Sequence, residues 1–290
     1  MTEVAPPDVT PDVAPELPPD LLHRFGLSAP VLRAKTPQAE IWQVERIAGG
    51  RAALKQYPGG DMGNEAAGVA YLQHCDGPPA VTILAASTDA VVMDWLEGPS
   101  LGDLARGGDC ATGDLALAEV ARLLLSRKVP GAGLLPLQQL FAPLPDCRFQ
   151  SPEGIAAQAV ARDCIRDLEV GRWPVVGLHG DLHHDNVIRT EAGMRAFDAK
   201  GIAGPAAYEL ANAFRHPRGC AAHTVDPEVI STRARAWSAA LGCRPDELLR
   251  WAISKAALSM AWSVAWAGRE RRQDLDLIAA LLRAEGSAWF

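Results

Sequence analysis

The sequence lacks the features of fibrous, disordered and membrane-spanning chains. Charged residues make up 22% of the 290 residues and hydrophobic residues 48%, with a mean hydropathy of -0.00. This balance is typical of a globular protein. The longest uncharged apolar stretch, residues 256–268, is shorter than the roughly 18 residues that indicate a membrane span. A chain of this length predicts one large domain or two unequal lobes.

Strongly basic segments and closely spaced cysteine pairs are also missing. The chain has 28 lysines and arginines against 35 aspartates and glutamates, a net charge of -7, and no basic stripe for a phosphate backbone. Its six cysteines are scattered without a C-x-x-C pair, which indicates reduced thiols in a cytoplasmic protein. We therefore expect no nucleic-acid, membrane or obligate protein partner.

The first twenty residues do not have the basic and apolar regions of a signal peptide. They are rich in proline and aspartate or glutamate, and they contain no lysine or arginine. We predict that residues 1–20 form a disordered acidic tail.

Residues 21–97 have the pattern of a small lobe with an antiparallel sheet. Four short strands are expected, at residues 40–47, 51–57, 81–85 and 90–95. The Gly49-Gly50 dipeptide permits the hairpin turn between the first two. Between the second and third strands, residues 64–74 have helical periodicity and place Glu65 on the apolar stripe. A buried carboxylate needs a cationic partner.

Helical periodicity dominates residues 98–290. Helices are expected at residues 114–128, 152–170, 225–241, 246–268 and 271–289. Trp251, Trp262 and Trp266 fall on one face of the fourth helix, which we interpret as a packed aromatic stripe. The pattern as a whole predicts an α+β protein with two lobes of unequal size.

A dense set of polar residues lies within residues 175–217. A short apolar strand runs into the loop 179–186, and a hairpin follows in which Gly193 permits a tight turn. Loops after short buried strands commonly display functional groups.

The hairpin predicts a pair of oxygen ligands. If its turn is symmetric about Ala192, Asn186 and Asp198 lie directly opposite each other on one face. Two oxygen donors so placed can bind Mg²⁺ and leave positions for phosphate oxygens. Asp181, five residues before Asn186, is close enough to take a proton from a nucleophile at that metal.

These residues resemble the catalytic motifs of kinases with the protein-kinase-like fold. Asp181 and Asn186 form the D-x-x-x-x-N pattern, and H-G-D in place of H-R-D is the form seen in aminoglycoside phosphotransferases. The runs L-H-G-D-L-H-H-D-N and F-D-A-K-G-I-A-G-P-A-A-Y-E-L-A-N-A-F-R-H-P resemble the aminoglycoside/hydroxyurea phosphotransferase branch, which contains the streptomycin 6-kinases. The resemblance implies a bilobal fold, with an N-lobe (21–97) of antiparallel sheet plus one helix and a larger, mostly helical C-lobe (98–290).

The resemblance also implies roles for single residues. Asp181 would be the catalytic base, and Asn186 and Asp198 would hold Mg²⁺ on the phosphates of ATP. Lys55 would contact the α- and β-phosphates, with Glu65 as its partner from the helix. This agrees with the need of a buried carboxylate for a cation.

Further positions resemble the nucleotide pocket and the structural anchors of these kinases. Met93 would lie at the back of the adenine pocket, and the backbone of Asp94 and Leu96 would meet the adenine edge. Glu209 resembles the buried acidic anchor of the family, and Lys200 could reach a phosphate or an anionic acceptor.

The sequence departs from the kinase pattern at two places. The turn at residues 34–39 has no G-x-G-x-x-G, so the means of covering the phosphates differs. Ala199 replaces the proline that is usual after the metal-binding aspartate of this branch.

We predict an ATP-dependent kinase that phosphorylates an alcohol group of an aminoglycoside or aminocyclitol-like acceptor, as an antibiotic-resistance enzyme does. Such polycations need an acidic cleft near Asp181, to which Asp185, Glu270 and Asp274 could contribute. A kinase of another small metabolite, such as a sugar or an amino alcohol, has the same core. A protein kinase is disfavoured, because Glu209 follows Asp198 too closely for a long activation segment.

Two alternatives belong to other classes of protein. A metallohydrolase could use the cluster His179, Asp181, His183, His184 and Asp185 as ligands for zinc. It would leave Lys55 and Asp198 without roles. A binding pseudokinase would lack a member of the catalytic set, and this sequence lacks none.

Overall fold

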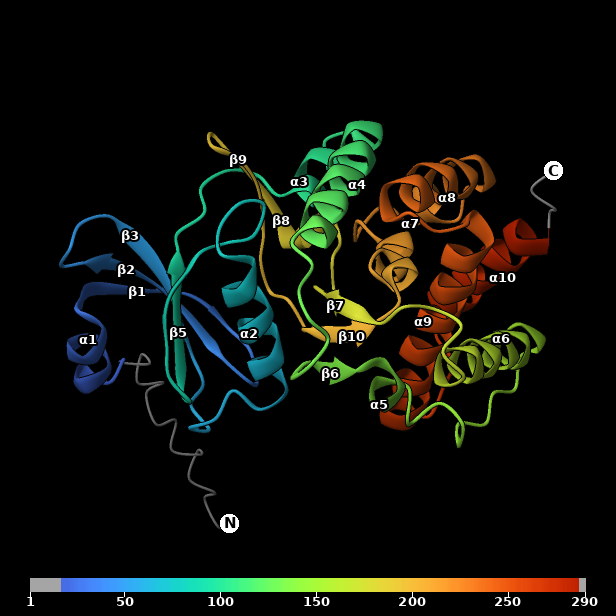
Figure 1. The fold of residues 1–290 in the computed structure, drawn as a ribbon, viewed down its shortest axis with the longest axis horizontal. Helices are drawn as coiled ribbons and strands as arrows, with labels where there is room; N and C mark the ends of the chain where they lie inside the picture. The colour runs from blue at the N-terminus through green and yellow to red at the C-terminus, as the bar shows by residue number, and fades with distance from the viewer. Residues whose placement is uncertain (1–16, 287–290) are drawn as a thin grey trace, which may run out of the picture. The chain divides into compact units, whose positions relative to one another are not determined.

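The computed structural model describes residues 17–286 and contains two compact units (Figure 1). The first unit comprises the chain up to Asp61 together with Leu84–Trp95, and the second comprises Met62–Ile83 and the chain from Leu96 on. Helix 64–74, which the sequence analysis places in the first lobe, belongs by its contacts to the second unit. A sheet in the first unit and helices in the second confirm the predicted α+β fold.

The predicted acidic tail lies mostly outside the described residues, because residues 1–16 are not among them. Its last residues have regular structure. Leu17 is buried, and helix α1 (Pro19–Phe25) begins with a proline, whose fixed φ suits the first turn.

The first unit is built on one five-stranded sheet. Its strands are β1 (Leu27–Lys35), β2 (Glu40–Arg46), β3 (Arg51–Gln56), β4 (Ile83–Ala86) and β5 (Ala90–Asp94). The strand order is β1-β2-β3-β5-β4, and β1, β2, β3 and β5 pair antiparallel along the sheet. Gly49 and Gly50 both have positive φ, which confirms their role in the turn between β2 and β3.

The two faces of this sheet differ in character. One face packs α1 against the buried side chains of Trp42, Leu54 and Val92. Because paired residues share a face and neighbours alternate, Lys55 and Met93 point from the opposite face.

The second unit is mainly helical. Its helices are α2 (Ala66–Cys75), α3 (Leu101–Arg106), α4 (Cys110–Ser126), α5 (Leu137–Leu140), α6 (Pro152–Glu169), α7 (Ala221–Thr224), α8 (Pro227–Leu241), α9 (Pro245–Ala267) and α10 (Arg272–Gly286). Short 3₁₀ helices occur at Gly63–Glu65, His184–Asn186, Ala206–Tyr208 and Ala211–Arg215. Its strands are β6 (Leu135–Pro136), β7 (Val176–Leu178), β8 (Val187–Thr190), β9 (Gly193–Ala196) and β10 (Ile202–Gly204). They form a β6-β10-β7 sheet and a β8-β9 hairpin.

Local sequence signals explain where the long helices begin and end. Ser151 accepts a hydrogen bond from Gly154 N at the start of α6, and Asp226 caps α8 in the same way. Gly242 ends α8 with a left-handed backbone. Helix α4 begins four residues before its predicted start, because Asp109 is its N-cap.

The core of the second unit is rich in aromatic rings. Trp251 is fully buried and meets Phe141, Trp173 and Tyr208 edge to face. The predicted aromatic stripe on α9 is wrong at its C-terminal end, where Trp262 is 39% and Trp266 is 87% exposed. The last turns of α9 therefore present aromatic side chains outside the core.

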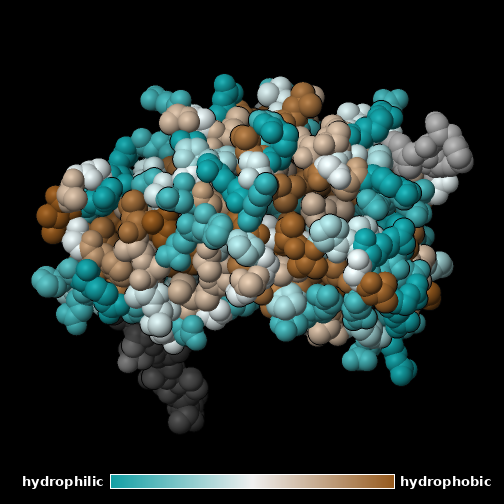
Figure 2. Space-filling view, in the orientation of Figure 1, coloured by the Kyte–Doolittle hydropathy of each residue, from teal (hydrophilic) through white to brown (hydrophobic). Residues whose placement is uncertain are grey.

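The surface and the cysteines agree with a globular protein. The space-filling view shows hydrophilic and hydrophobic residues intermixed over the visible face (Figure 2). No helix within residues 17–286 is both long enough and apolar enough to cross a bilayer. All six cysteines lie within the described residues, and none is in a disulfide.

Candidate functional site

The loop after β7 is fixed by a buried carboxylate. Glu209 accepts hydrogen bonds from the backbone N–H groups of His179 (3.1 Å) and Gly180 (3.2 Å). Burial raises the pKa of Glu209 to about 7 despite these two bonds. Gly180 has a φ of 77°, and a Cβ there would lie 2.2 Å from Ile202 Cγ1. The loop that carries Asp181 thus needs both the anchor and the glycine.

Asp181 follows this anchored turn and is oriented by two side chains. Its Oδ1 accepts a hydrogen bond from Asn212 Nδ2 at 2.7 Å, and its Oδ2 lies 3.8 Å from Lys200 Nζ. Burial acts to raise the pKa of Asp181, but nearby charges, among them Lys200 and Lys255, leave it below its usual value. Asp181 is therefore ionised and held in place at neutral pH.

Asn186 and Asp198 flank the β8-β9 hairpin, but the predicted register is wrong by one residue. Val187 pairs with Ala196 and Thr190 with Gly193. The N–H of Phe197 donates to Asn186 O at 3.0 Å, so Phe197 rather than Asp198 faces Asn186. The turn contains two residues instead of three, which shifts every pair by one.

The two predicted metal ligands have oxygen atoms suited to a hard cation. Asn186 is buried, and its Nδ2 donates to Asp181 O at 3.0 Å, so the amide nitrogen faces the loop. Asp198 is exposed and has a φ of 61°, a left-handed conformation that is costly for a residue with a Cβ. An amide oxygen and a carboxylate match the ligand chemistry of Mg²⁺.

Helix α2 presses directly on the loop that follows Asp198. A Cβ on Gly68 would lie 1.7 Å from Ala199 O, and a Cβ on Gly201 would lie 2.1 Å from Ala67 O. The N–H of Lys200 donates to His179 O at 2.7 Å from the other side. Backbone contacts therefore fix the position of this loop.

The histidines of the motif support the loop and have protein partners of their own. His179 Nε2 donates to Phe197 O at 3.0 Å, and burial lowers the pKa of His179 to about 4. His183 stacks on His216 at 3.7 Å between ring centres, and burial lowers the pKa of His183 to about 3. Both imidazoles are therefore neutral at pH 7.

A buried network under the loop involves a residue that sequence reasoning interpreted only as a helix start. Asp114 on α4 accepts a hydrogen bond from His184 Nε2 at 2.8 Å and from Arg233 Nε at 2.9 Å. Trp237 Nε1 donates to the backbone oxygen of Asp114. This network joins α4, α8 and the loop.

The cluster considered for zinc does not converge. Within residues 17–286, the group of three side chains close enough to share an ion is His183, Asp185 and His216. Arg106 Nη1 lies 2.7 Å from Asp185 Oδ1 and already supplies a positive charge there. With Asp185 committed to Arg106 and His216, a cation at this position would meet repulsion.

A cavity of about 1280 Å³ opens beside Asp181 within the second unit. The loop after β7 contributes Asp181 and His183, and the helices α9 and α10 contribute Lys255, Trp262 and Asp274 among others. A cavity of this size can hold a small organic molecule.

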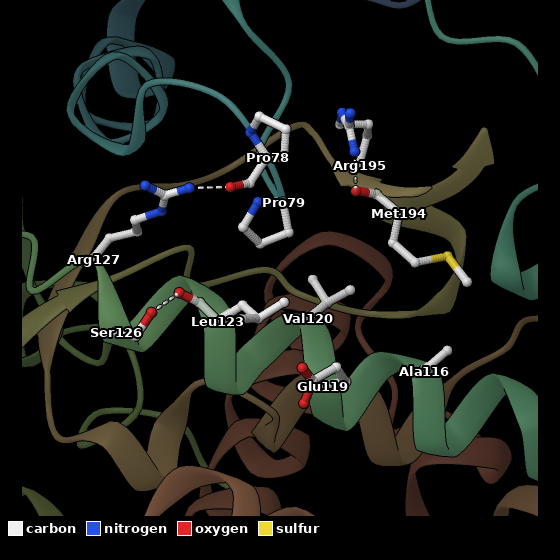
Figure 3. A pocket seen from close by; sticks show the side chains of 10 residues that line it. All are labelled: Pro78, Pro79, Ala116, Glu119, Val120, Leu123, Ser126, Arg127, Met194 and Arg195. Carbon is white, nitrogen blue, oxygen red and sulfur yellow. Dashed lines mark hydrogen bonds between the residues drawn. The ribbon is translucent and has the colours of Figure 1, made fainter. Parts of the chain in front are cut away.

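A second cavity, of about 380 Å³, is lined by α4, β9 and the 78–79 segment (Figure 3). Its lining is mainly apolar, with Pro79, Val120 and Met194 facing one another, and Arg127 at one end donating to Pro78 O. It contains no member of the predicted catalytic set.

The remaining predicted residues lie on or next to the sheet of the first unit, except one. Lys55 is half-buried on β3, and Met93 and Asp94 end β5, with Leu96 two residues further on. Glu65 lies in the 3₁₀ turn before α2, in the second unit. The pairing of Lys55 with Glu65 and the adenine contacts stay predictions.

Two residues of the site were not predicted. Asn212 orients Asp181, and its signal was its place in the motif run after Glu209. Lys255 lines the cavity, and its signal was a lone charge within an apolar helical stretch.

Known proteins are similar to this chain in sequence and in fold. The family model described as aminoglycoside/hydroxyurea antibiotic resistance kinase matches residues 24–266. A streptomycin 3''-kinase of Klebsiella pneumoniae is 34% identical over 212 residues, which cover 69% of this chain and 76% of that protein.

Solved structures agree on the fold. An amicoumacin kinase in complex with AMP-PNP, Ca²⁺ and Ami matches with a TM-score of 0.60 and 10% identity, covering 93% of each chain. Plasmodium vivax ethanolamine kinase matches with a TM-score of 0.57 and 16% identity, covering 93% of this chain and 83% of that one.

Fold, motif and relatives define a phosphotransferase that acts on small molecules, and not a metallohydrolase. The chain belongs to the aminoglycoside/hydroxyurea antibiotic resistance kinase family.

Proposed function

We propose that the protein transfers the γ-phosphoryl group of ATP to a hydroxyl group of a small molecule bound in the 1280 Å³ cavity. The observation that carries this proposal is Asp181, held by Asn212 and Lys200 at the edge of that cavity. A bond forms between the acceptor oxygen and the γ-phosphorus, and the bond from that phosphorus to the β–γ bridging oxygen breaks. ADP leaves, and the hydroxyl proton goes to Asp181.

Asp181 acts mainly by orienting the acceptor. Its Oδ1 is occupied by Asn212, so Oδ2 is the oxygen that accepts a hydrogen bond from the acceptor hydroxyl. A carboxylate with a lowered pKa is a weak base, which suits a reaction whose transition state needs positioning more than early proton removal.

Asn186 and Asp198 are the residues that would hold Mg²⁺. When bound, the ion neutralises charge on the transferred phosphoryl group. The left-handed backbone of Asp198 supports this role, because strained residues occur where the surrounding structure holds them for function. Lys55 would bind the α- and β-phosphates of ATP, with Glu65 as its partner. Met93 and the backbone of Asp94 and Leu96 would bind adenine.

Two classes of acceptor are candidates. The predicted aminoglycoside or aminocyclitol-like acceptor is supported by family membership and by the streptomycin 3''-kinase relative. Another small metabolite is favoured by the charges of the cavity, which has more basic than acidic side chains in its lining.

The base assignment is tested with Asp181→Asn. The amide keeps the size of the side chain but cannot take a proton, so we expect turnover to fall by about 10²- to 10⁴-fold while ATP binding changes little. ADP release and calorimetric titration with ATP measure the two quantities. Asp163→Asn, a change on the exposed face of α6, is the matched control. Turnover at the wild-type rate in Asp181→Asn would overturn the assignment.

A further inference from the structure

The cavity beside Asp181 has an excess of positive side chains. Its cationic residues are Lys200, Arg215, Arg218, Lys255, Arg271 and Arg283, against three aspartates. The two histidines of the lining, His183 and His216, add no charge at pH 7, because burial lowers the pKa of both. The acceptor therefore enters a positively charged environment.

The carboxylates other than Asp181 in the lining are already matched by arginines. Asp274 Oδ1 lies 2.6 Å from Arg215 Nη2, and Asp276 Oδ1 lies 2.9 Å from Arg272 Nε. Asp274 is only 2% exposed, and its second oxygen is sealed from solvent. The Asp274 pair is buried, whereas Asp276 and Arg272 form an exposed pair.

The acidic cleft expected for a polycationic acceptor is not formed. Asp185 is bound by Arg106 and does not line the cavity. Glu270 accepts hydrogen bonds from the N–H groups of Gln150 (2.6 Å) and Ser151 (3.3 Å), and it too is absent from the lining. An amine-rich acceptor would meet more cationic than acidic side chains in this lining.

Among the cationic residues of the lining, Lys255 is buried and forms no ion pair with a carboxylate of the described residues. It is 5% exposed on α9, its Nζ donates to Ser259 Oγ at 3.0 Å, and it lies 5.1 Å from the ring centre of Trp262. Within the described part of the chain, no carboxylate forms an ion pair with it. A hydroxyl and an aromatic ring compensate a buried ammonium only in part.

We infer that the acceptor is an alcohol that also carries an anionic group, a carboxylate or a phosphate ester, which Lys255 and the neighbouring arginines bind while the hydroxyl faces Asp181. This inference rests on the proposed phosphotransferase function. Trp262 and Trp266 also line this cavity, and aromatic rings can pack against the face of a sugar-like ring.

Hexose derivatives and streptomycin, which differ in charge, test the inference directly. Glucuronate and glucose 6-phosphate provide the two anionic groups, glucose is neutral, and glucosamine and streptomycin are cationic. We expect an anionic compound to give a kcat/KM for ADP release about tenfold above that of glucose, since one added charge-assisted hydrogen bond is worth about that factor. Glucosamine is expected to be the poorest hexose. The better of glucuronate and glucose 6-phosphate identifies the anionic group.

The same compounds are titrated by calorimetry into the enzyme loaded with Mg²⁺ and AMP-PNP, so that binding is measured even where the hydroxyl is not phosphorylated. Tighter binding or faster turnover of streptomycin or glucosamine than of both anionic compounds overturns the inference and leaves the kinase function intact. Equal binding of anionic and neutral hexoses also overturns it. Failure of the proposed function has a different signature, namely no ATP binding and no ADP release with any compound.

Variants at Lys255 locate the anion. Lys255→Gln should raise the KM or Kd of the anionic hexose about tenfold and change kcat little, and Lys255→Arg should restore most of the affinity. Arg166→Gln removes a positive charge from an exposed ion pair on α6 and should leave all these values unchanged. Unaltered charge preference in a folded Lys255→Gln enzyme would overturn the assignment of Lys255.

Discussion

At the scale of single residues, burial shifts the pKa values of an acidic and a basic group of the site in opposite directions. Burial raises the pKa of Glu209 to about 7 and lowers the pKa of Lys255 to about 8, because a buried site disfavours the charged form of either group. Both groups therefore titrate close to neutral pH. Both carboxylate oxygens of Glu209 accept hydrogen bonds from backbone N–H groups, so Glu209 anchors the loop. Within residues 17–286, Ser259 is the one hydrogen-bond acceptor of Lys255, which leaves two ammonium protons for a ligand.

The titration of Lys255 predicts a pH dependence of acceptor binding. Burial, with the charge of Arg215, lowers the pKa of Lys255 to about 8, while Asp181 and Asp274 act to raise it and Lys200 to lower it. An anion binds the protonated ammonium, so kcat/KM for an anionic hexose should fall as the pH rises through about 8. The bound anion stabilises the ammonium, so the fall in kcat should come at higher pH. Lys255→Arg should abolish the fall in kcat/KM, because a guanidinium stays charged. An unchanged profile would contradict this prediction.

The sequence indicated which residues belong to the candidate site better than it indicated their hydrogen-bond partners. Asp181, Asn186 and Asp198 were singled out by an assumed hairpin pairing and by a resemblance to kinase motifs, and the anchor role of Glu209 fits its contacts. The partners of a buried residue depend on distant elements. Asp114 was interpreted as a charge suited to a helix start, yet it binds Arg233, which lies 119 positions further along the chain.

At the scale of elements, hydrophobic period located most helices and strands, but not their register. The hairpin β8-β9 was predicted at the right place, and a turn one residue shorter moved Asp198 out of direct opposition to Asn186. Strand β1 was not predicted, because its burial does not alternate regularly and its pairing with β2 shifts register twice. Hydrophobic periodicity identifies a helix or strand, whereas turn length and irregular pairing decide which residues of two strands pair.

The contact of α2 with the loop after Asp198 predicts that Gly68 is needed for metal binding. In Gly68→Ala the new Cβ would lie 1.7 Å from Ala199 O, so the helix or the loop must move. We expect a loss of about 1–3 kcal/mol in the free energy of unfolding and a weaker apparent affinity for Mg²⁺ in the ADP-release assay. Gly113→Ala on α4 is the matched control, because its Cβ would lie 3.5 Å from His184 Cδ2 and a helical alanine is favourable. Equal melting temperatures and equal Mg²⁺ dependence in the two variants would show that the contact does not matter.

At the scale of the whole molecule, family membership gives the reaction class and leaves the acceptor open. Solved structures of this fold include kinases named for ethanolamine and for amicoumacin, although both are under 20% identical to the chain. Fold alone therefore does not identify a substrate. In the proposed function, the acceptor is selected by side chains that line one cavity of the second unit. This lining contains six cationic side chains, although the whole chain has a net charge of -7.

The chain has a negative net charge but its cavity has a cationic lining, and this difference predicts how salt changes the KM for the acceptor. Ions screen charges over a Debye length of about 8 Å at 0.15 M ionic strength, and they compete with a bound anion at the exposed Arg218 and Arg271. The KM for an anionic hexose should therefore rise with potassium chloride, while the KM for glucose should change little. Buried Lys255 is screened less, so part of the preference should persist at high salt. Steady-state ADP release at several salt concentrations, with ATP saturating throughout, measures both acceptors. A KM for the anionic hexose that falls with salt would mean that the negative field of the whole molecule outweighs the cavity.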